Sequence, residues 1–346
     1  MKRALTVLAA LMLLAGCAGT AGPSQTSASP TPTPSPTPET TSPSPSPTPR
    51  PTPEPTWPLT GLPAPSHDAG PVIGVKVENS LAARPQTGLE AADVVFVEMV
   101  EGGQTRYHAL YNSVVPAVVG PVRSLRPMDA AILGQWRAAL VYSGGQPQFE
   151  RRVANAGIQL MYEASEFGFF RDRTRRSPHN LYVTLPTAVG AILPGHDASP
   201  TPLFGYSSIP PIGTPARVVR AIYPSVRSGW EWDEGAGAWL RYDDGVQSLT
   251  ADATAQLRAT NVLVLRVAIS DTGAKDSAGA PVPETVLTGS GELRQFTAGR
   301  MVEGTWTKGG DNDPFVFTDS AGLPLLLLPG STWVELLPLE GTLEVE

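Results

Sequence analysis

The hydrophobic pattern divides the chain into stretches of different character. Residues 4–14 are apolar except for Thr6, and two basic residues precede them. From Gly22 to Pro58 nearly every position is Pro, Thr or Ser, and apolar side chains are almost absent. Such a segment cannot bury enough apolar surface to fold, so we expect a disordered tether over residues 18–57. Alternating and helical patterns begin only after it.

Strand patterns alternate with helical patterns in residues 58–211. Residues 71–79 alternate Ile73, Val75 and Val77 with polar or small residues, which predicts a strand. Residues 93–101 and 105–112 predict a hairpin around a two-residue Gly102-Gly103 turn. Further patterns predict strands at 139–143 and 181–184, and helices at 127–140, 147–156 and 186–193. This mixture predicts a layered α/β (α+β) domain that contains an antiparallel hairpin.

Residues 214–338 contain strand patterns almost exclusively. Glycine or aspartate turns separate short apolar runs, as in Asp243-Asp244-Gly245. Regularly spaced short strands predict a β-rich C-terminal domain. The acidic end, residues 340–346, is expected to fray. The predicted strands are 216–223, 229–232, 239–242, 261–268, 304–307, 315–318, 325–328 and 332–337.

The N-terminal 17 residues have the composition of a secretory signal. A basic start, a short apolar region and small residues lead directly to Cys17, the chain's single cysteine. The apolar region is too short to span a bilayer, which takes about 20 residues. The cysteine at the cut resembles the bacterial lipoprotein signal, which implies a lipid on Cys17 and a membrane anchor on the extracytoplasmic side. The alternative is an ordinary cleaved signal in which Cys17 is incidental.

Charge and motif content exclude several function classes. The net charge is −7, whereas nucleic-acid binding calls for a basic excess, so we expect no nucleic-acid partner. The sequence contains no phosphate-binding loop, hydrolase elbow or zinc motif, and its four histidines are scattered. We therefore expect no cofactor and no metal.

The predicted hairpin brings polar residues together. With a two-residue turn, Met99 would oppose Arg106, and Glu98 would lie on the opposite face with Tyr107. Glu101 and Arg106 would be diagonal neighbours, close enough to pair. The alternative to a functional role is a cross-strand salt bridge on a solvated face. The face shared with Arg106 would carry Glu101, Gln104 and His108.

The segment before the predicted 127–140 helix concentrates arginines. Arg123, Ser124 and Arg126 would project where a helix start presents free N–H groups and the positive end of its dipole. Guanidinium groups at such a place favour an anion site. The alternative is capping by Ser124 or by a carboxylate, with the arginines forming ion pairs at the core edge.

Two further loops supply candidate ligand-binding residues. In the arginine-rich run 171–176, Arg173 and Arg175 are expected to be solvated. Arg171 precedes His179 and Asn180, which stand directly before a predicted strand, where loop side chains often point into a site. Gly144 and Gly145 form a glycine turn into a helix, again with exposed amides.

Six segments carry a family resemblance in chain order: 58–62, 84–89, 101–106, 120–127, 178–182 and 329–333. Together they resemble the YerB-like lipoproteins, a family of two-part proteins with no established function. The resemblance covers 58–338 and implies a layered β-β-α architecture for 58–211 and a second domain at 214–338. The chain departs from the family by having Tyr142 and Ser143 before the glycine turn, where a histidine and a small residue are expected.

These observations favour a surface-anchored protein that binds a phosphate- or carboxylate-bearing envelope polymer or small molecule. A second hypothesis is an envelope hydrolase that uses Glu101 and His179 as acid and base. A third is a scaffold that recruits proteins through the β-rich part. The sequence contains no evident nucleophile–base pair, so an enzyme is the less favoured reading.

Overall fold

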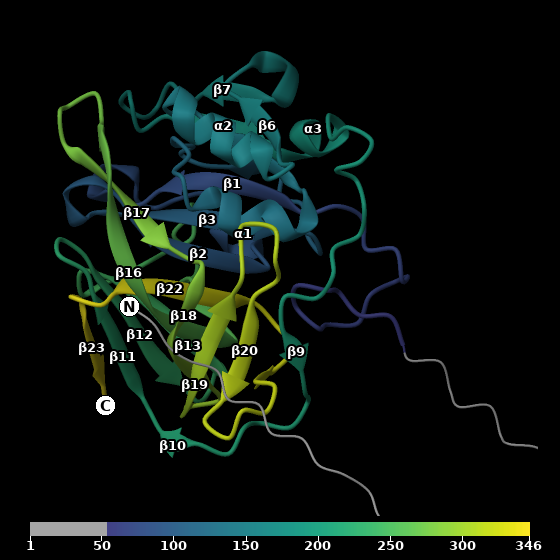
Figure 1. The fold of residues 1–346 in the computed structure, drawn as a ribbon, viewed down its shortest axis with the longest axis vertical. Helices are drawn as coiled ribbons and strands as arrows, with labels where there is room; N and C mark the ends of the chain where they lie inside the picture. The colour runs from purple at the N-terminus through teal and green to yellow at the C-terminus, as the bar shows by residue number, and fades with distance from the viewer. Residues whose placement is uncertain (1–53) are drawn as a thin grey trace, which may run out of the picture. The chain divides into compact units, whose positions relative to one another are not determined.

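A twelve-stranded mixed sheet runs through both halves of the chain (Figure 1). The computed structural model describes residues 54–346; the signal segment with Cys17, and the tether up to residue 53, lie outside the described residues. The N-terminal half contributes β1 (Ile73–Glu78), β2 (Val94–Met99), β3 (Thr105–Tyr111), β5 (Ala139–Tyr142) and β6 (Gln159–Tyr162). The C-terminal half contributes β10 (Thr214–Pro215), β16 (Asn261–Lys275), β17 (Pro281–Val286), β18 (Gly289–Thr297), β19 (Arg300–Lys308), β20 (Val316–Asp319) and β22 (Thr332–Pro338).

The two halves join where β2 pairs in parallel with β22. The strand order is β10-β19-β18-β16-β22-β2-β3-β1-β5-β6, with β17 on β16 and β20 on β19. β1, β5 and β6 are parallel neighbours, so their carboxyl ends meet at one edge of the sheet, where β3 begins.

Three smaller sheets complete the strands. One contains β4 (Val118–Val119), β8 (Leu181–Thr184) and β7 (Phe169–Arg171), and another pairs β9 (Gly205–Tyr206) with β21 (Leu326–Leu327). The third is a six-stranded sheet of β14 (Val246–Gln247), β13 (Ala238–Asp243), β12 (Arg227–Asp233), β11 (Val218–Ile222), β23 (Thr342–Val345) and β15 (Arg258–Ala259).

Both faces of the large sheet are buried, because alternate residues of each strand enter different cores. Val95 and Val97 of β2 pack with the β4-β8-β7 sheet and with Trp230 and Trp239 of the six-stranded sheet. Phe96, on the other face, packs with α1 (Asp129–Leu133) and α2 (Pro147–Asn155). The N-terminal half is thus a β-β-α arrangement, which confirms the expected α+β class and the β-rich C-terminal part.

Helices are few and short. Besides α1, α2 and α3 (Leu185–Gly190), residues 54–346 contain 3₁₀ turns at Leu81–Ala83, Leu89–Ala91, Glu101–Gly103, Gly134–Trp136 and Ser165–Phe167. No helix in this part of the chain has the length and apolar character needed to span a bilayer.

The predicted helix over 127–140 is wrong in length. α1 ends at Leu133, a 3₁₀ turn follows, and Arg137 has a φ of 50° before β5 begins. Gly134 weakens the helix, and a Cβ at this position would lie 2.6 Å from the backbone oxygen of Asp311, so the close approach requires glycine.

Three strands of the C-terminal half correct the sequence-based expectation. β17 and β18 were not predicted, because their polar residues obscure the alternation. The segment 340–346, expected to fray, forms β23, and backbone pairing with β11 holds it in place.

Candidate functional site

The hairpin of β2 and β3 has a register that differs by one residue from the predicted one. Gln104 pairs with Val100, not with Glu101, and the loop has three residues, 101–103. Gly102 and Gly103 both have left-handed φ values, 67° and 69°, which glycine adopts freely. A shift of one residue exchanges the faces of a strand. Glu98 therefore lies opposite Arg106 rather than on the face of Tyr107.

This register creates a row of charges on the helix-covered face of the sheet. Glu98 of β2 and Glu78 of β1 lie on either side of Arg106. One step further along the strands, His108 lies opposite Lys76. The row leads from a fully buried interior at Lys76 to the partly exposed edge where β1 ends.

The buried end of the row is a group of four ionisable side chains with no exposed surface: Lys76, Glu98, His108 and Asp129. The ammonium of Lys76 lies 2.6 Å from Glu98 Oε2 and 2.7 Å from Asp129 Oδ1. His108 Nδ1 lies 2.8 Å from the same Asp129 oxygen. Burial alone would raise the pKa of Asp129, but the charges of Lys76 and His108 outweigh it and lower that pKa.

Glu98, His108 and Asp129 have ligand atoms close enough together to surround a metal ion. The Lys76 ammonium, however, already occupies the space between the two carboxylates. An ammonium, rather than a cation from solution, therefore lies between these carboxylates. Local alternation does not reveal this group, because Lys76 and Glu98 occupy positions that it assigns to the solvated face.

The exposed end of the row gathers the arginines singled out from the sequence. Arg126 Nη2 lies 2.5 Å from Glu101 Oε1, and Arg106 Nη2 lies 3.6 Å from Glu101 Oε2. Arg123 Nη2 lies 2.7 Å from Glu78 Oε1. Burial and the neighbouring Arg126 lower the pKa of Arg106 to about 10, which leaves it charged at neutral pH.

His179 joins this end through Glu78. Its Nδ1 lies 2.8 Å from Glu78 Oε1 and 3.2 Å from Arg123 Nη2. Burial alone would raise the pKa of Glu78, but hydrogen bonds from Arg123 and Ser80 and the charge of Arg123 outweigh it and lower that pKa. We call the residues that meet here the charged edge: Glu78, Glu101, Arg106, Arg123, Arg126 and His179.

Hydrogen bonds to the backbone hold the loop of residues 123–126 in place, so the loop is not an open helix start. The amide of Arg126 donates to Asp129 Oδ2 at 2.7 Å, so the expected open N–H group is already bonded. Arg106 Nη1 donates to the carbonyl of Ser124. The carbonyl of Gly144 accepts a hydrogen bond from the amide of Leu125, and Gly144 packs against Ser124. Gly145 lies beside the side chain of Leu125.

Arg171 and Asn180 lie in a neighbouring arrangement. Arg171 donates to Asn180 Oδ1 at 3.1 Å and to Glu163 at 2.7 Å. The Asn180 amide bonds in turn to the carbonyl of Asp172. These contacts hold the loop that carries His179, so Arg171 supports the charged edge without reaching its glutamates.

The structure does not bring Glu101 and His179 together as the acid–base pair considered for a hydrolase. Glu101 contacts Arg106 and Arg126, whereas His179 contacts Glu78, so the two groups belong to different ion pairs. Ser80 lies 3.5 Å from the same His179 nitrogen that faces Glu78. A catalytic triad needs its hydroxyl and its carboxylate on opposite ring nitrogens.

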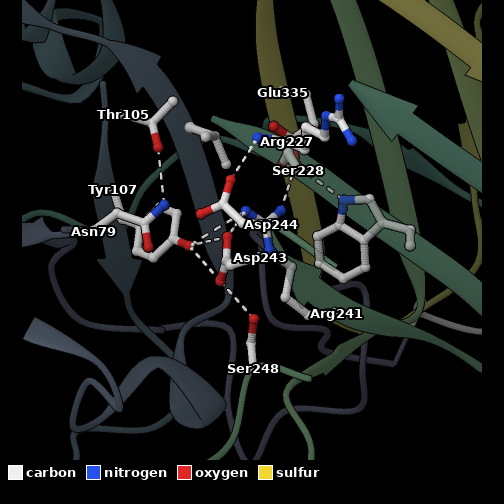
Figure 2. Close-up of polar contacts among 12 residues, drawn as sticks. Asn79, Thr105, Tyr107, Arg227, Ser228, Arg241, Asp243, Asp244, Ser248 and Glu335 are labelled. Carbon is white, nitrogen blue, oxygen red and sulfur yellow. Dashed lines mark hydrogen bonds and ion pairs between the residues drawn. The ribbon is translucent and has the colours of Figure 1, made fainter. Parts of the chain in front are cut away.

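A second buried network lies on the opposite face of the sheet (Figure 2). Arg241 of β13 donates to Glu335 at 2.5 Å and to Asp243 at 2.8 Å. Its guanidinium carbon lies about 5 Å from the ring centres of Trp230 and Trp333. Trp230 and Trp239 are fully buried and so belong to the core.

Tyr107 connects this network to the N-terminal half. Its hydroxyl donates to Asp243 at 3.1 Å (Figure 2). Burial alone would raise the pKa of Asp243, but the charges of Arg241 and Arg84 outweigh it and lower that pKa. No local pattern identifies the contact of Tyr107 with Asp243 or that of Arg241 with Glu335, because the partners lie more than ninety positions apart in the sequence.

Comparisons with known proteins assign the chain to a family. Two family models match, "Protein of unknown function (DUF3048) N-terminal domain" over residues 59–196 and its "C-terminal domain" over 219–334. "Putative lipoprotein YerB" of Bacillus subtilis (strain 168) is 26% identical over 296 residues, covering 81% of this chain and 86% of that protein. The crystal structure of the YerB protein from Bacillus subtilis has the same fold, with a TM-score of 0.71 and 23% identity over 84% of this chain and 99% of that one. The expected resemblance is confirmed: the chain belongs to the DUF3048 family and has the YerB lipoprotein as a relative.

Proposed function

We propose that this protein is a lipoprotein, anchored through Cys17 on the extracytoplasmic side of the membrane, that binds an anionic envelope ligand at its charged edge. The observation that carries the proposal is the meeting of three arginines and His179 around only two glutamates, Glu78 and Glu101. The three guanidinium groups outnumber the two glutamates with which they form ion pairs.

The shared glutamates orient the guanidinium groups without using all their donors. Among the described residues, the hydrogen bonds and ion pairs of the Arg123 side chain all use Nη2, which leaves Nη1 and Nε for a ligand. An arginine offers five N–H donors in a planar fork that matches a carboxylate or phosphate. Glutamates that position the fork in advance reduce the ordering cost of binding.

The test measures binding of the full chain in detergent to cell-wall fragments at low and high salt. Each charge-assisted hydrogen bond contributes about 1.5–3 kcal/mol, so Arg123→Gln is expected to weaken binding about tenfold or more. Arg123→Gln/Arg126→Gln is expected to weaken it further. High salt should weaken binding by the wild type because ions screen the attraction.

Arg220→Gln is the matched control, since it also removes an arginine from an ion pair, with Glu346, but far along the chain in β11. It should leave binding unchanged. Equal binding by wild type and Arg123→Gln, with both proteins folded by circular dichroism, would refute the proposal. Release of soluble sugars or peptides from the fragments, lost in His179→Ala, would instead establish the hydrolase.

A further inference from the structure

A cavity distinct from the charged edge lies between the two halves of the chain. Its volume is about 460 Å³, within the range of roughly 300–1,000 Å³ that small-molecule sites occupy. One wall comes from residues 81–86, between β1 and β2, and the other from residues 243–253, after β13. We call it the Arg84 pocket.

The walls of the Arg84 pocket expose apolar side chains. Leu81 and Val246 are 81% and 68% exposed, and Pro85 and Leu249 add further apolar surface. Large apolar side chains exposed in a concave site gain free energy when a ligand with an apolar body covers them. The shape and lining of the pocket therefore favour an apolar ligand body.

The polar groups at the floor of the pocket are already hydrogen-bonded to other protein groups. Asp243 accepts hydrogen bonds from Tyr107, Arg241 and Ser248 (Figure 2). Ser248 uses its hydroxyl hydrogen in that contact. A ligand must therefore find its polar partners at the rim.

One ion pair supplies both signs of charge at the rim. Arg84 Nη1 lies 3.0 Å from Asp244 Oδ2. Asn79 holds Arg84 from behind, accepting from its Nε and Nη2, and the amide of Arg227 donates to the other oxygen of Asp244. Asp244 remains 45% exposed, so its carboxylate can accept further hydrogen bonds.

This pair discriminates between ligand charges. A purely cationic ligand would leave the guanidinium of Arg84 without a new partner, and a purely anionic one would leave the exposed carboxylate of Asp244 without one. A ligand with both an ammonium and a carboxylate satisfies Asp244 and Arg84 together. At about 30 Å³ per water, the cavity equals roughly fifteen waters, which is a comparable number of non-hydrogen atoms to a short peptide.

We propose that the Arg84 pocket binds a small zwitterion with an apolar body, of the size of a short apolar peptide. The proposal is independent of anion binding at the charged edge, because it uses none of the residues of that edge.

Calorimetric titration of the full chain in detergent with four probes tests the assignment. Leu-Leu has both charges and an apolar body, N-acetyl-Leu-Leu lacks the ammonium, Leu-Leu amide lacks the carboxylate, and Gly-Gly lacks the apolar body. Leu-Leu is expected to bind at least tenfold more tightly than each of the others. Binding of Gly-Gly or of either single-charge probe as tight as that of Leu-Leu, or no binding of Leu-Leu, would overturn the proposal.

Variants locate the binding. Val246→Glu, at a wall position that is 68% exposed, and Asp244→Asn should each weaken Leu-Leu binding at least tenfold. Ile212→Glu, at a 99% exposed apolar position outside the pocket, is the matched control and should bind as the wild type does. Unchanged Leu-Leu binding by Val246→Glu would show that the peptide binds elsewhere.

Discussion

At the scale of single residues, buried charges organise both faces of the central sheet. Lys76 lies between Glu98 and Asp129 on the helix-covered face, and Arg241 lies between Asp243 and Glu335 on the other. Removing one member of such a group is costly, because it leaves an opposite charge buried without compensation. Asp129 has a further role, since it also accepts the amide of Arg126 and so positions the loop of the charged edge.

Asp129→Asn is therefore expected to lower the free energy of unfolding at pH 7 by about 3–5 kcal/mol. The folded protein lowers the pKa of Asp129, so this carboxylate stabilises the fold above its unfolded pKa of about 3.9 and loses that contribution as the pH falls below it. As the pH falls below about 4, the free energy of unfolding of the variant should decrease less steeply than that of the wild type. Urea unfolding at a series of pH values measures this.

Asp197→Asn is the control at an exposed turn and should keep the wild-type profile. An Asp129→Asn variant with the wild-type acid slope would show that other carboxylates carry the acid dependence.

At the scale of elements, the C-terminal segment shows how pairing overrides local composition. Residues 342–345 are mostly exposed and half of them are polar, yet four backbone register positions pair them with β11 as the edge strand β23. Arg220 adds an ion pair with Glu346. Backbone pairing, together with the partial burial of Leu343, therefore holds this end of the chain in the sheet.

Deletion of residues 340–346 is expected to destabilise the protein by about 2 kcal/mol, because it removes four cross-strand residue pairs whose side-chain contacts contribute roughly 0.2–1 kcal/mol each. Chemical denaturation measures the change. Arg220→Gln removes only the exposed ion pair and should cost less than about 1 kcal/mol. A deletion with no effect on the denaturation midpoint would mean that the segment frays in solution.

At the scale of the whole molecule, one sheet crosses the boundary between the two family regions. β22, from the end of the chain, pairs in parallel with both β2 and β16. Tyr107 in the first half bonds to Asp243 in the second. Neither half can bury the edge of β2 or β22 without the other, and an exposed central strand edge favours aggregation.

We therefore expect residues 54–211, expressed alone, to show no cooperative thermal unfolding and a poorly dispersed NMR spectrum. Adding residues 212–346 during refolding should restore both signals. A well-dispersed spectrum of the isolated fragment, with a melting temperature near that of the whole chain, would show instead that the first half folds independently.

Local patterns predicted the elements whose signals are local. Alternation located β1, β2 and β3, and Pro147 with Gly157 marked the ends of the α2 region. The same reasoning overextended the helix after Pro127, and it missed β18, whose Arg294 and Gln295 interrupt the apolar run. It also identified Arg123, Arg126 and His179 as candidate ligand-binding residues, because arginine clusters and loop histidines can be recognised in the sequence itself.

The sequence by itself determined the order of the segments, the α+β character, the β-rich second half and the family, because these depend on composition, short-range periodicity and motif order. Only the tertiary structure decided the partners: Glu78 for Arg123, Glu101 for Arg126, Lys76 for Asp129. Partnership depends on strand register and on contacts between distant segments. A one-residue difference in the turn at Gly102 was enough to exchange the face on which Glu98 lies.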